Sequence, residues 1–464
     1  MIPTTLIIFG ATGDLAKTKL FPSLYHLDKN GLLPNIFNIV AVGRKKLNIT
    51  ELLAGLETYM IEKYPHTYSK DVWQRFSSKI TYYAGNFEDE NTYLKLAEHL
   101  GSVDSKHNTC AYKIFYMAVS PDLFEVVAKG IKHAELNQTC TGGKPTKIIV
   151  EKPFGKSLES FKTLNAYLLQ LFNENQIYRI DHLLGKETVQ NILYFRLANS
   201  LLDPNLDAKL VDSIEIKYLE SNGIGTRGAY FDSYGQLRDM LQSHMLQLFA
   251  TTFMDIPESI DPKEISSAKV KMLNSLKISN VVRAQYTEGV INGKKVNNYL
   301  NEPNVSPTSM TETFVRLDGV ITNDTWNNTK ISFVSGKALS TKITEVVVNY
   351  KKLNKLKTFT SANKLIFRIQ PEEGITLIVK VKKPGQDEME DVRMSFKFNE
   401  SFPGLLGDAY EAILLDLIKD RNLFSITTNE LEASWQVVDP ILKAWETDSA
   451  DMKKYPAGSD EMLI

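Results

Sequence analysis

The sequence predicts two domains: an N-terminal doubly wound parallel sheet of the α/β class, and a larger C-terminal α+β domain built on a mostly antiparallel sheet and helices. Three observations lead to this prediction. The chain has 464 residues, more than one hydrophobic core usually serves. Short apolar runs alternate with longer helical patterns in the first third, as in parallel sheets covered on both faces. After residue 210, segments of alternating apolar and polar residues follow one another closely, as in antiparallel sheets.

The N-terminal domain is expected to span residues 1–178. Four apolar runs in it have the length of buried strands, and a helical pattern follows the first of them. A later helical pattern ends in the polar stretch 173–175, which places the boundary close by. The expected strands are Thr5–Phe9, Ile39–Val42, Ile114–Val119 and Lys147–Val150, and the helix covers about Ala16–Leu27.

The C-terminal domain is expected to span residues 179–464. Its period-2 segments indicate strands with one buried and one exposed face, and helical patterns precede and follow them. The expected strands are Ser213–Tyr218, Thr313–Leu317, Lys330–Val334, Glu345–Tyr350, Leu365–Gln370 and Ile375–Val381. The expected helices cover residues 181–200, 232–254, Asp408–Lys419 and Thr428–Glu446.

The composition excludes several classes of protein. Apolar residues make up 43% and charged residues 23% of the chain, a balance typical of soluble globular proteins. The formal net charge of −1 gives no reason to expect a nucleic acid as partner. No apolar run reaches the roughly 20 residues that a membrane span needs. We therefore expect neither a nucleic-acid nor a membrane partner.

Two further features favour a cytoplasmic location. The two cysteines, Cys110 and Cys140, form neither a disulfide framework nor a metal-ligand pattern. We therefore expect a reducing compartment and no metal. The apolar start of the chain runs directly into a glycine turn without a basic leader, so it is interpreted as a strand and not as a signal peptide.

A glycine turn follows the first expected strand and precedes the first helix. Glycines let the backbone approach a pyrophosphate, and the N-terminus of the following helix favours an anion. The spacing GxxGDL differs from the common GxGxxG, but dinucleotide sites occupy this same place between strand and helix. The sequence therefore predicts a Rossmann-like coenzyme site at the turn of residues 10–15.

The end of the second expected strand indicates which coenzyme binds. NAD-selective folds usually carry an acidic residue at this position, whereas this chain carries Arg44, followed by Lys45 and Lys46. A guanidinium can pair with a 2′-phosphate through two hydrogen bonds. Arg44 therefore favours NADP, and a solvated basic turn is the alternative interpretation.

Three chemically active side chains lie at the start of the next expected helix. His182 and Lys186 are four residues apart, so on a helix they would share a face and could hold one phosphate together. Asp181 would point about 100° away from His182 and serve another partner.

His244 lies on the apolar face of the helix expected over residues 232–254. It is either a core histidine that hydrogen-bonds to a backbone carbonyl or a general base that removes a hydroxyl proton. A general base of this kind needs a carboxylate to orient it. Asp239 is five positions away, about 140° round an α-helix, so Asp181 is the better candidate.

Two lysines follow expected strands. Lys152 comes directly after the apolar run that ends at Val150, so it lies at the carboxyl edge where parallel sheets bind ligands. Pro153 after it can form a cis peptide bond. Lys337 follows a later strand. A lone lysine is usually solvated surface, which is the alternative interpretation.

Taken together, these segments resemble the glucose-6-phosphate dehydrogenase family. The resemblance rests on separate motifs that occur in the family's order over nearly the whole chain. They are GATGDLAKTKLFPSLYHL, AVGRK, FYMAVSPDLF, IIVEKPFG, YRIDHLLGKETVQNI, RGAYFDSYGQLRDMLQSHMLQ, SGKAL, DAYEAILLD, VDPILKAWE and YPAGS. The resemblance implies an enzyme that oxidises glucose 6-phosphate at C1 by hydride transfer to NADP+. The product would be 6-phospho-D-glucono-1,5-lactone, in the first step of the oxidative pentose phosphate pathway.

The resemblance also implies roles for individual residues. His244 is the base and Asp181 orients it, while Lys152 contacts the sugar near the reacting carbon and also the coenzyme. His182 and Lys186 hold the sugar phosphate. The other implied contacts are to the substrate, at Glu220, Asp239, Lys337 and Lys342, and to the coenzyme, at Gly10, Thr12, Gly13, Asp14, Leu15 and Arg44.

The chain departs from the family's pattern in four places, one of which is the unusually polar segment 326–330. Leu183 stands where the family commonly has tyrosine, so one hydrogen-bond donor to the phosphate is lost. Lys342 stands where many members have arginine, which reduces a two-bond contact to a point charge. The chain ends soon after YPAGS, so we expect it to lack the second, structural NADP site that animal forms carry on a longer tail.

The resemblance implies a homodimer through the large sheet, or a homotetramer built from such dimers. Two other functions stay open: an oxidoreductase of the glucose–fructose oxidoreductase type acting on another sugar, and a catalytically inactive nucleotide-binding or regulatory protein. The pair His182 and Lys186 argues against the first, whose substrates need not be phosphorylated. The presence of His244, Asp181 and Lys152 argues against the second.

Overall fold

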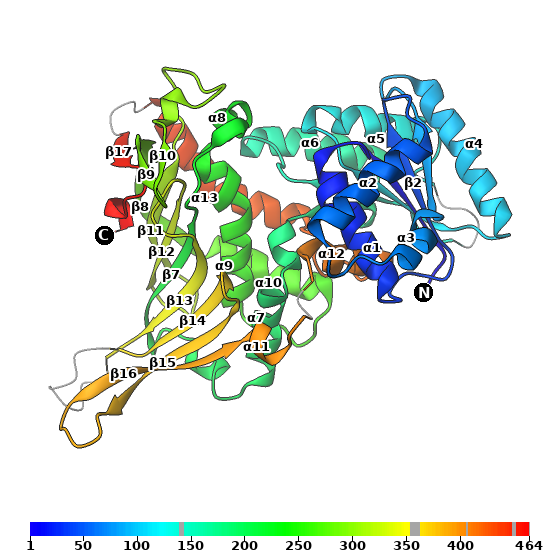
Figure 1. Cartoon of the computed structure of the whole chain (residues 1–464). Helices are drawn as coiled ribbons and strands as arrows, with labels where there is room; N and C mark the ends of the chain where they lie inside the picture. The colour runs from blue at the N-terminus through cyan, green and yellow to red at the C-terminus, as the bar shows by residue number, and fades with distance from the viewer. Residues whose placement is uncertain (139–142, 353–361, 405–406, 448–451, 464) are drawn as a thin grey trace. The chain divides into compact units, whose positions relative to one another are not determined.

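The structure is a computed structural model that describes residues 1–138, 143–352, 362–404, 407–447 and 452–463 (Figure 1). The chain forms two compact units. One is built on a parallel sheet and the other on a mostly antiparallel sheet, so the predicted fold class is confirmed. The first unit comprises Met1–Gly155, Glu159–Gly185 and Asp408–Thr428, and the second comprises Lys156–Leu158, Lys186–Gly407 and Asn429–Ile464.

This division differs from a single boundary between residues 178 and 179. The first unit continues to Gly185 and includes a segment from near the C-terminus. That segment carries α12 (Ala409–Ile418), whose side chains Ile413 and Leu414 are fully buried in the core of the first unit. The apolar pattern of a helix indicates that one face is buried, but not against which sheet.

The first unit is built on six parallel strands in the order β3-β2-β1-β4-β5-β6. All four predicted strands are present, and β3 and β6 are additional. The order reverses between β1 and β4, and sheets of this type bind ligands beyond the carboxyl ends of the strands at such a reversal. The strands are β1 (Thr4–Phe9), β2 (Phe37–Gly43), β3 (Ile80–Ala84), β4 (Tyr112–Met117), β5 (Lys147–Glu151) and β6 (Ile177–Ile180).

Helices cover both faces of this sheet (Figure 1). Ile8 of β1 belongs to the cluster that α1, α2, α3 and α12 complete. Its neighbour Phe9 points the opposite way and meets Tyr93 of α4, with ring centroids 6.0 Å apart. The helices are η1 (Ala16–Leu20), α1 (Phe21–Lys29), α2 (Ile49–Lys63), α3 (Lys70–Ser77), α4 (Glu90–Lys106), η2 (Pro121–Leu123), α5 (Phe124–His133), α6 (Leu158–Leu171), η3 (Glu174–Gln176) and η4 (His182–Gly185).

The second unit is built on nine strands in the order β16-β15-β14-β13-β7-β12-β11-β8-β17. All neighbours are antiparallel except β7 with β12 and β8 with β17, which are parallel. The six predicted strands are present, while β8, β16 and β17 were not predicted. The strands are β7 (Val211–Leu219), β8 (Leu276–Thr287), β11 (Phe314–Ile321), β12 (Thr329–Gly336), β13 (Ile343–Tyr350), β14 (Lys364–Gln370), β15 (Gly374–Lys382), β16 (Met389–Lys397) and β17 (Lys453–Pro456), with a separate hairpin of β9 (Gly289–Ile291) and β10 (Lys294–Val296).

Helices line one side of this sheet (Figure 1). η7 contacts β7 and β12, and α7 contacts β14. The helix expected over residues 232–254 is present but not regular. It is kinked near its start, and its middle is a π-helix. The helices are α7 (Glu187–Ala198), η5 (Asp203–Asn205), η6 (Gly225–Arg227), α8 (Gly228–Gln236), η7 (Leu237–Met245), α9 (Leu246–Phe253), α10 (Pro262–Asn274), η8 (Tyr299–Asn301), α11 (Phe398–Ser401), α13 (Thr428–Thr447) and η9 (Glu461–Leu463).

A kink at Gly235 sets the start of η7. Gly235 has φ 77° and ψ 170°, a conformation that is essentially restricted to glycine. A Cβ at this position would lie 2.6 Å from the buried carboxylate of Glu312. That carboxylate accepts a hydrogen bond of 2.8 Å from the backbone N–H of Leu237 and so satisfies one of the free donors at the start of the helix. Glycine and glutamate together fix the direction of η7.

Two expectations about the whole chain can be compared with the structure. Cys110 is disulfide-bonded, although the cysteine count gave no reason to expect a disulfide, so the argument for a reducing compartment loses its basis. Cys140 lies outside the described residues. Within the described ranges, none of the helices combines the length and the apolar character that a membrane span requires.

We expect Gly235→Ala to lower the free energy of unfolding by about 1–3 kcal/mol, because alanine adds backbone strain at this φ and ψ and also overlaps Glu312. Urea and thermal denaturation of the two proteins measure the difference. Gly293→Ala is the matched control, since Gly293 also has φ +77° but has no heavy atom within 4 Å of a Cβ. If the free energy of unfolding fell equally in the two variants, the contact with Glu312 would not contribute to the loss.

Candidate functional site

The glycine turn after β1 has the close backbone packing that a phosphate site needs. Gly10 has φ +81°, and a Cβ there would lie 2.2 Å from the carbonyl oxygen of Ala118, just beyond β4. The backbone N–H of Gly10 donates to Val42 O at 3.0 Å, and that of Gly13 donates to Gly10 O at 2.8 Å. The turn therefore lies at the reversal of strand order, with no room for a side chain at Gly10.

The other predicted coenzyme residues surround this turn. Thr12 and Asp14 are exposed, and Leu15 is half-buried at the start of the π-helix η1. The strand–turn–helix arrangement is the one expected from the sequence, and it leaves the turn accessible to a pyrophosphate. A coenzyme role for these residues stays a prediction.

Arg44 follows β2 and is exposed, like Lys45 and Lys46. The preceding residue, Gly43, lies close to the turn, since a Cβ there would be 3.4 Å from Thr12 Cγ2. The guanidinium of Arg44 is thus attached at the same sheet edge as the glycine turn. This is where an adenosine 2′-phosphate lies in folds of this type.

Lys152 stands at the carboxyl end of β5, as predicted, and its peptide bond to Pro153 is cis. Glu151 before it is a buried acid that the sequence analysis did not single out. The Tyr116 hydroxyl donates to Glu151 Oε1. Burial raises the pKa of the Glu151 carboxyl to about 7, despite this hydrogen bond.

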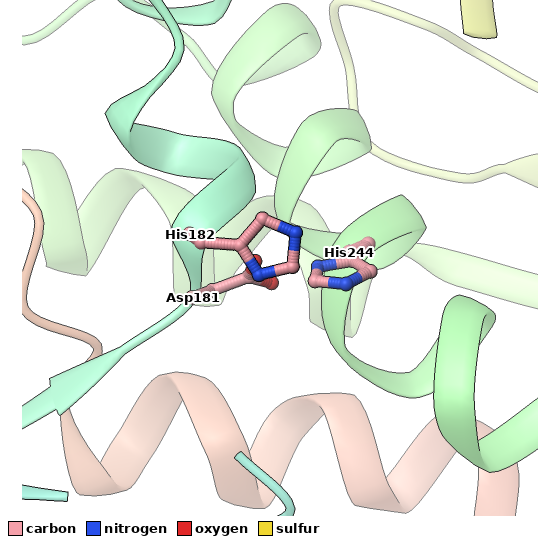
Figure 2. Close-up of side chains that lie close together, drawn as sticks. All are labelled: Asp181, His182 and His244. Carbon is pink, nitrogen blue, oxygen red and sulfur yellow. The ribbon is translucent and has the colours of Figure 1, made fainter. Parts of the chain in front are cut away.

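Asp181 and His182 follow β6 directly, and Figure 2 shows both side chains leaving this segment. Asp181 is fully buried, and its Oδ1 accepts a hydrogen bond of 2.9 Å from the N–H of Leu183. The ring of His182 lies parallel to that of Tyr410, with an interplanar angle of 9° and centroids 6.3 Å apart. Leu183 is 1% exposed, so its side chain packs inside the unit.

The structure corrects the helical argument for His182 and Lys186. His182 belongs to the short 3₁₀-helix η4, and α7 starts only at Glu187. Lys186 between them is extended, with φ −69° and ψ 130°, so the two residues do not share the face of one helix. Lys186 Nζ lies 3.5 Å from Glu373 Oε1, and the sequence pattern gave no sign of this break in the helix.

His244 lies on the π-helix η7 and is 2% exposed (Figure 2). Its ring lies parallel to that of Tyr218 of β7, at 15° and with centroids 6.1 Å apart. The angle of 140° between Asp239 and His244 assumed an α-helix and is wrong here, because a π-helix repeats by i→i+5 bonds and brings such residues near one face. Burial and the charge of Asp239 raise the pKa of the Tyr230 hydroxyl.

Glu220 and Lys337 are brought together by the parallel pairing of β7 and β12. Leu219 and Gly336, the last residues of these strands, are register partners, so the next residue of each strand lies at the same edge. Lys337 Nζ pairs with Glu220 Oε2. Lys337 is 2% exposed, which excludes the interpretation as solvated surface. Lys342, in contrast, is exposed between β12 and β13.

Sequence reasoning missed three groups near these residues: Glu151, Tyr410 and Glu312. Glu151 and Tyr410 stand within the motifs IIVEKPFG and DAYEAILLD. A glutamate that ends an apolar strand was the one signal that could have drawn attention to Glu151. Glu312 caps η7 from a distant segment, and a helix cap of that kind leaves no local pattern.

Glu151 makes the stability of the protein depend on pH. Its carboxyl ionises near 4.5 in an unfolded chain and near 7 in the folded one. Between these values the folded protein binds more protons, so its stability falls as the pH rises. Glu151→Gln cannot ionise, and we expect its Tm relative to the wild type to rise between pH 5 and pH 8.

Thermal denaturation at the two pH values measures this difference. Glu62→Gln, on the exposed side of α2, is the control for removing a carboxylate. A Tm difference between Glu151→Gln and the wild type that does not change with pH would contradict the raised pKa of Glu151.

Comparison with known proteins extends over the whole chain. Residues 7–191 match the family model "Glucose-6-phosphate dehydrogenase, NAD binding domain", and residues 193–462 match "Glucose-6-phosphate dehydrogenase, C-terminal domain". The match of the first domain confirms the prediction of a nicotinamide-coenzyme domain.

Individual relatives agree with the family models. The chain is 35% identical to glucose-6-phosphate 1-dehydrogenase of Chlamydia muridarum, over 99% of this chain and 95% of the relative. It is 37% identical to that of Dickeya dadantii, over 98% and 94% of the two chains. A solved structure of a glucose-6-phosphate dehydrogenase in complex with its substrate glucose-6-phosphate superimposes with a TM-score of 0.93, at 30% identity, over 100% of this chain and 96% of the other. This chain belongs to the glucose-6-phosphate dehydrogenase family.

Proposed function

We propose that this protein oxidises glucose 6-phosphate at C1 with NADP+ as hydride acceptor and forms 6-phosphoglucono-δ-lactone. The observation that carries the proposal is the full-length similarity to a glucose-6-phosphate dehydrogenase described as bound to glucose-6-phosphate. The local chemistry supports it, because acid, base and cation side chains stand at the ends of the strands where such ligands bind.

The first unit fits a nicotinamide coenzyme. The space beside Gly10 would be filled by a Cβ, so the backbone there can approach a pyrophosphate closely. Thr12, Asp14 and Leu15 belong to the same turn, and Arg44 offers two donors to a 2′-phosphate. When bound, NADP+ supplies the hydride acceptor.

His244 acts as the general base in this proposal. It takes the proton of the C1 hydroxyl while the C1 hydrogen leaves with its electron pair, so that the C–O single bond becomes the carbonyl of the lactone. Asp181 orients the imidazole and stabilises its charged form. Lys152, at the carboxyl end of β5, holds the oxygen and the coenzyme near the reacting carbon.

The remaining residues bind the substrate. His182 and Lys186 hold the 6-phosphate, and Lys342 adds a point charge. Glu220 and Lys337 form an ion pair that offers an acceptor and a donor side by side, which suits a sugar hydroxyl, because it donates one hydrogen bond and accepts another. Asp239 accepts from a further hydroxyl.

The proposal includes assembly as a homodimer through the large sheet, or as a homotetramer. A hollow on the sheet of the second unit is lined by both signs of charge, among them Glu215, Lys217, Arg316 and Asp318. Mixed charges of this kind suit a self-complementary interface, in which the same patch occurs on both copies. A cytoplasmic location stays a prediction.

Absorbance of reduced nicotinamide tests the function and the base together. We expect the wild type to reduce NADP+ rapidly with glucose 6-phosphate and far more slowly with free glucose.

His244→Asn should lower kcat by about 10²- to 10⁴-fold, because the general base is lost, while the substrate still binds. His99→Asn, a change of histidine on α4, serves as control. No reduction by the wild type would refute the proposed function, and near-normal turnover by His244→Asn would remove that residue from its role.

Arg44 decides the coenzyme preference in this proposal. We expect Arg44→Ala to raise KM for NADP+ by about 10- to 100-fold, the size of a lost hydrogen bond between charged groups, with little change for NAD+. Steady-state kinetics with each coenzyme provide the measurement. Lys46→Ala removes an exposed cation two residues further on and should change neither value. An equal rise in KM for NAD+ and for NADP+ would show that Arg44 does not bind the 2′-phosphate.

A further inference from the structure

Tyr455, in the motif YPAGS near the end of the chain, has no part in the proposed mechanism. It lies on β17, at the edge of the nine-stranded sheet, and is 0% exposed. Its hydroxyl donates a hydrogen bond of 2.6 Å to the carbonyl oxygen of Lys337. The carbonyl oxygen of Thr313 is a second, more distant acceptor at 3.4 Å. The last strand of the chain therefore contacts the lysine that follows β12.

The backbone next to Lys337 is strained. Ala338 has φ 52°, a left-handed conformation that is unfavourable for alanine and persists only where the surrounding structure holds it. Its N–H donates to Asn222 O at 3.0 Å, and its carbonyl oxygen accepts from the N–H of Gly458 at 2.8 Å. Two segments that are distant in sequence thus hold the turn after β12, and one of them is the motif that contains Tyr455.

Lys337 itself is held at its backbone and at its ammonium group. Its N–H donates to Thr313 O at 2.9 Å, and its carbonyl oxygen accepts from Tyr455. The ammonium group pairs with Glu220 and lies 5.4 Å from the centre of the Phe231 ring. Because the side chain is only 2% exposed, its place beside Glu220 depends on where this backbone is fixed.

The hydroxyl group of Thr313 orients that of Tyr455. The two oxygen atoms are 3.0 Å apart, and Thr313 Oγ1 also accepts from the N–H of Tyr286 at 3.0 Å. A tyrosine hydroxyl has a single proton, so Thr313 donates to Tyr455 while the tyrosine proton points to the carbonyl oxygen of Lys337. This row of buried donors and acceptors ends at the residue that carries the ammonium group.

We propose that Tyr455 is a positioning residue for the pair Glu220 and Lys337: its hydroxyl holds the strained turn after β12, so that the ammonium group lies beside the carboxylate before the substrate binds. Groups held in this way bind a ligand without the entropic cost of ordering them at that moment. The inference rests on the proposed function, in which this pair binds a sugar hydroxyl. It assigns Tyr455 no contact with the substrate.

Tyr455→Phe tests the inference, because it removes the hydroxyl and keeps the ring. We expect KM for glucose 6-phosphate to rise about three- to tenfold, the size of one lost hydrogen bond. The pair binds the sugar and takes no part in the chemical step, so kcat should stay within about twofold of the wild type. KM for NADP+ should not change. Steady-state kinetics with each substrate varied in turn measure these values, and a general loss of structure would alter all of them.

Tyr299→Phe is the matched control. Tyr299 is also 0% exposed and belongs to the same apolar cluster as Tyr455. Its hydroxyl donates at 2.6 Å as well, but to Asp232 of α8. The variant therefore loses an equally buried hydrogen bond away from the turn, and KM for glucose 6-phosphate should stay as in the wild type. A rise equal to that in Tyr455→Phe would show that any buried hydroxyl of this unit has the same effect.

Lys337→Met shows whether Tyr455 acts through the lysine. Methionine keeps an unbranched side chain but removes the charge, so KM for glucose 6-phosphate should rise. Adding Tyr455→Phe to this variant should raise KM no further, because the tyrosine and the lysine act as a unit. If the two rises multiplied, Tyr455 would act by a path that does not include Lys337, and the inference would be wrong.

The outcomes separate the inference from the function on which it rests. A wild type that does not oxidise glucose 6-phosphate refutes the proposed function. If the wild type is active, the inference alone is overturned when Tyr455→Phe leaves KM for glucose 6-phosphate unchanged, lowers kcat instead, or raises KM for NADP+ equally. If Tyr455→Phe fails to fold, Thr313→Val decides, since it removes the donor that orients the tyrosine. A selective rise in KM for glucose 6-phosphate supports the inference, and an unchanged KM overturns it.

Discussion

The close approach of Gly10 to the carbonyl of Ala118 is the contact on which the coenzyme end of the site depends. It occurs where the strand order of the first unit reverses, between β1 and β4. Parallel strands end at one edge of a sheet, and a reversal leaves a crevice there. The glycine turn, Arg44 after β2 and Lys152 after β5 therefore belong to one edge, although more than a hundred residues separate the first from the last. Membership of the family indicates that the ligand is a nicotinamide coenzyme, and the strand order of the sheet explains why it would bind at this edge.

A comparable constraint operates in the second unit. β7 and β12 run parallel within an otherwise mostly antiparallel sheet, so Glu220 and Lys337 emerge side by side. The helix that carries His244 is directed by the kink at Gly235 and by the carboxylate of Glu312. π-Helices are rare in proteins as a whole, but those that occur are often found at functional sites. Buried polar groups thus orient the elements that carry the candidate chemistry, at some expense in stability.

Much of the fold could be predicted from the residues alone. Ten strands were expected from their periodicity and all ten are present, because buried strands leave a pattern of apolar residues. β3 and β6 were missed, since β3 is a half-exposed edge strand and β6 is four residues long with a buried arginine, Arg179, inside it. The break at Lys186 was missed because a helical spacing of residues does not show where the backbone leaves the helix.

The sequence by itself determined the fold class, the glycine turn, the basic strand end and the family, because each depends on residues that are adjacent in the chain. Tertiary structure alone decided that Asp408–Thr428 belongs to the first unit, that Lys337 is buried against Glu220, and that the Tyr116 hydroxyl donates to Glu151. These facts join segments that are far apart in sequence. Local patterns record whether a side chain is buried, and only the packing of strands and helices determines what it is buried against.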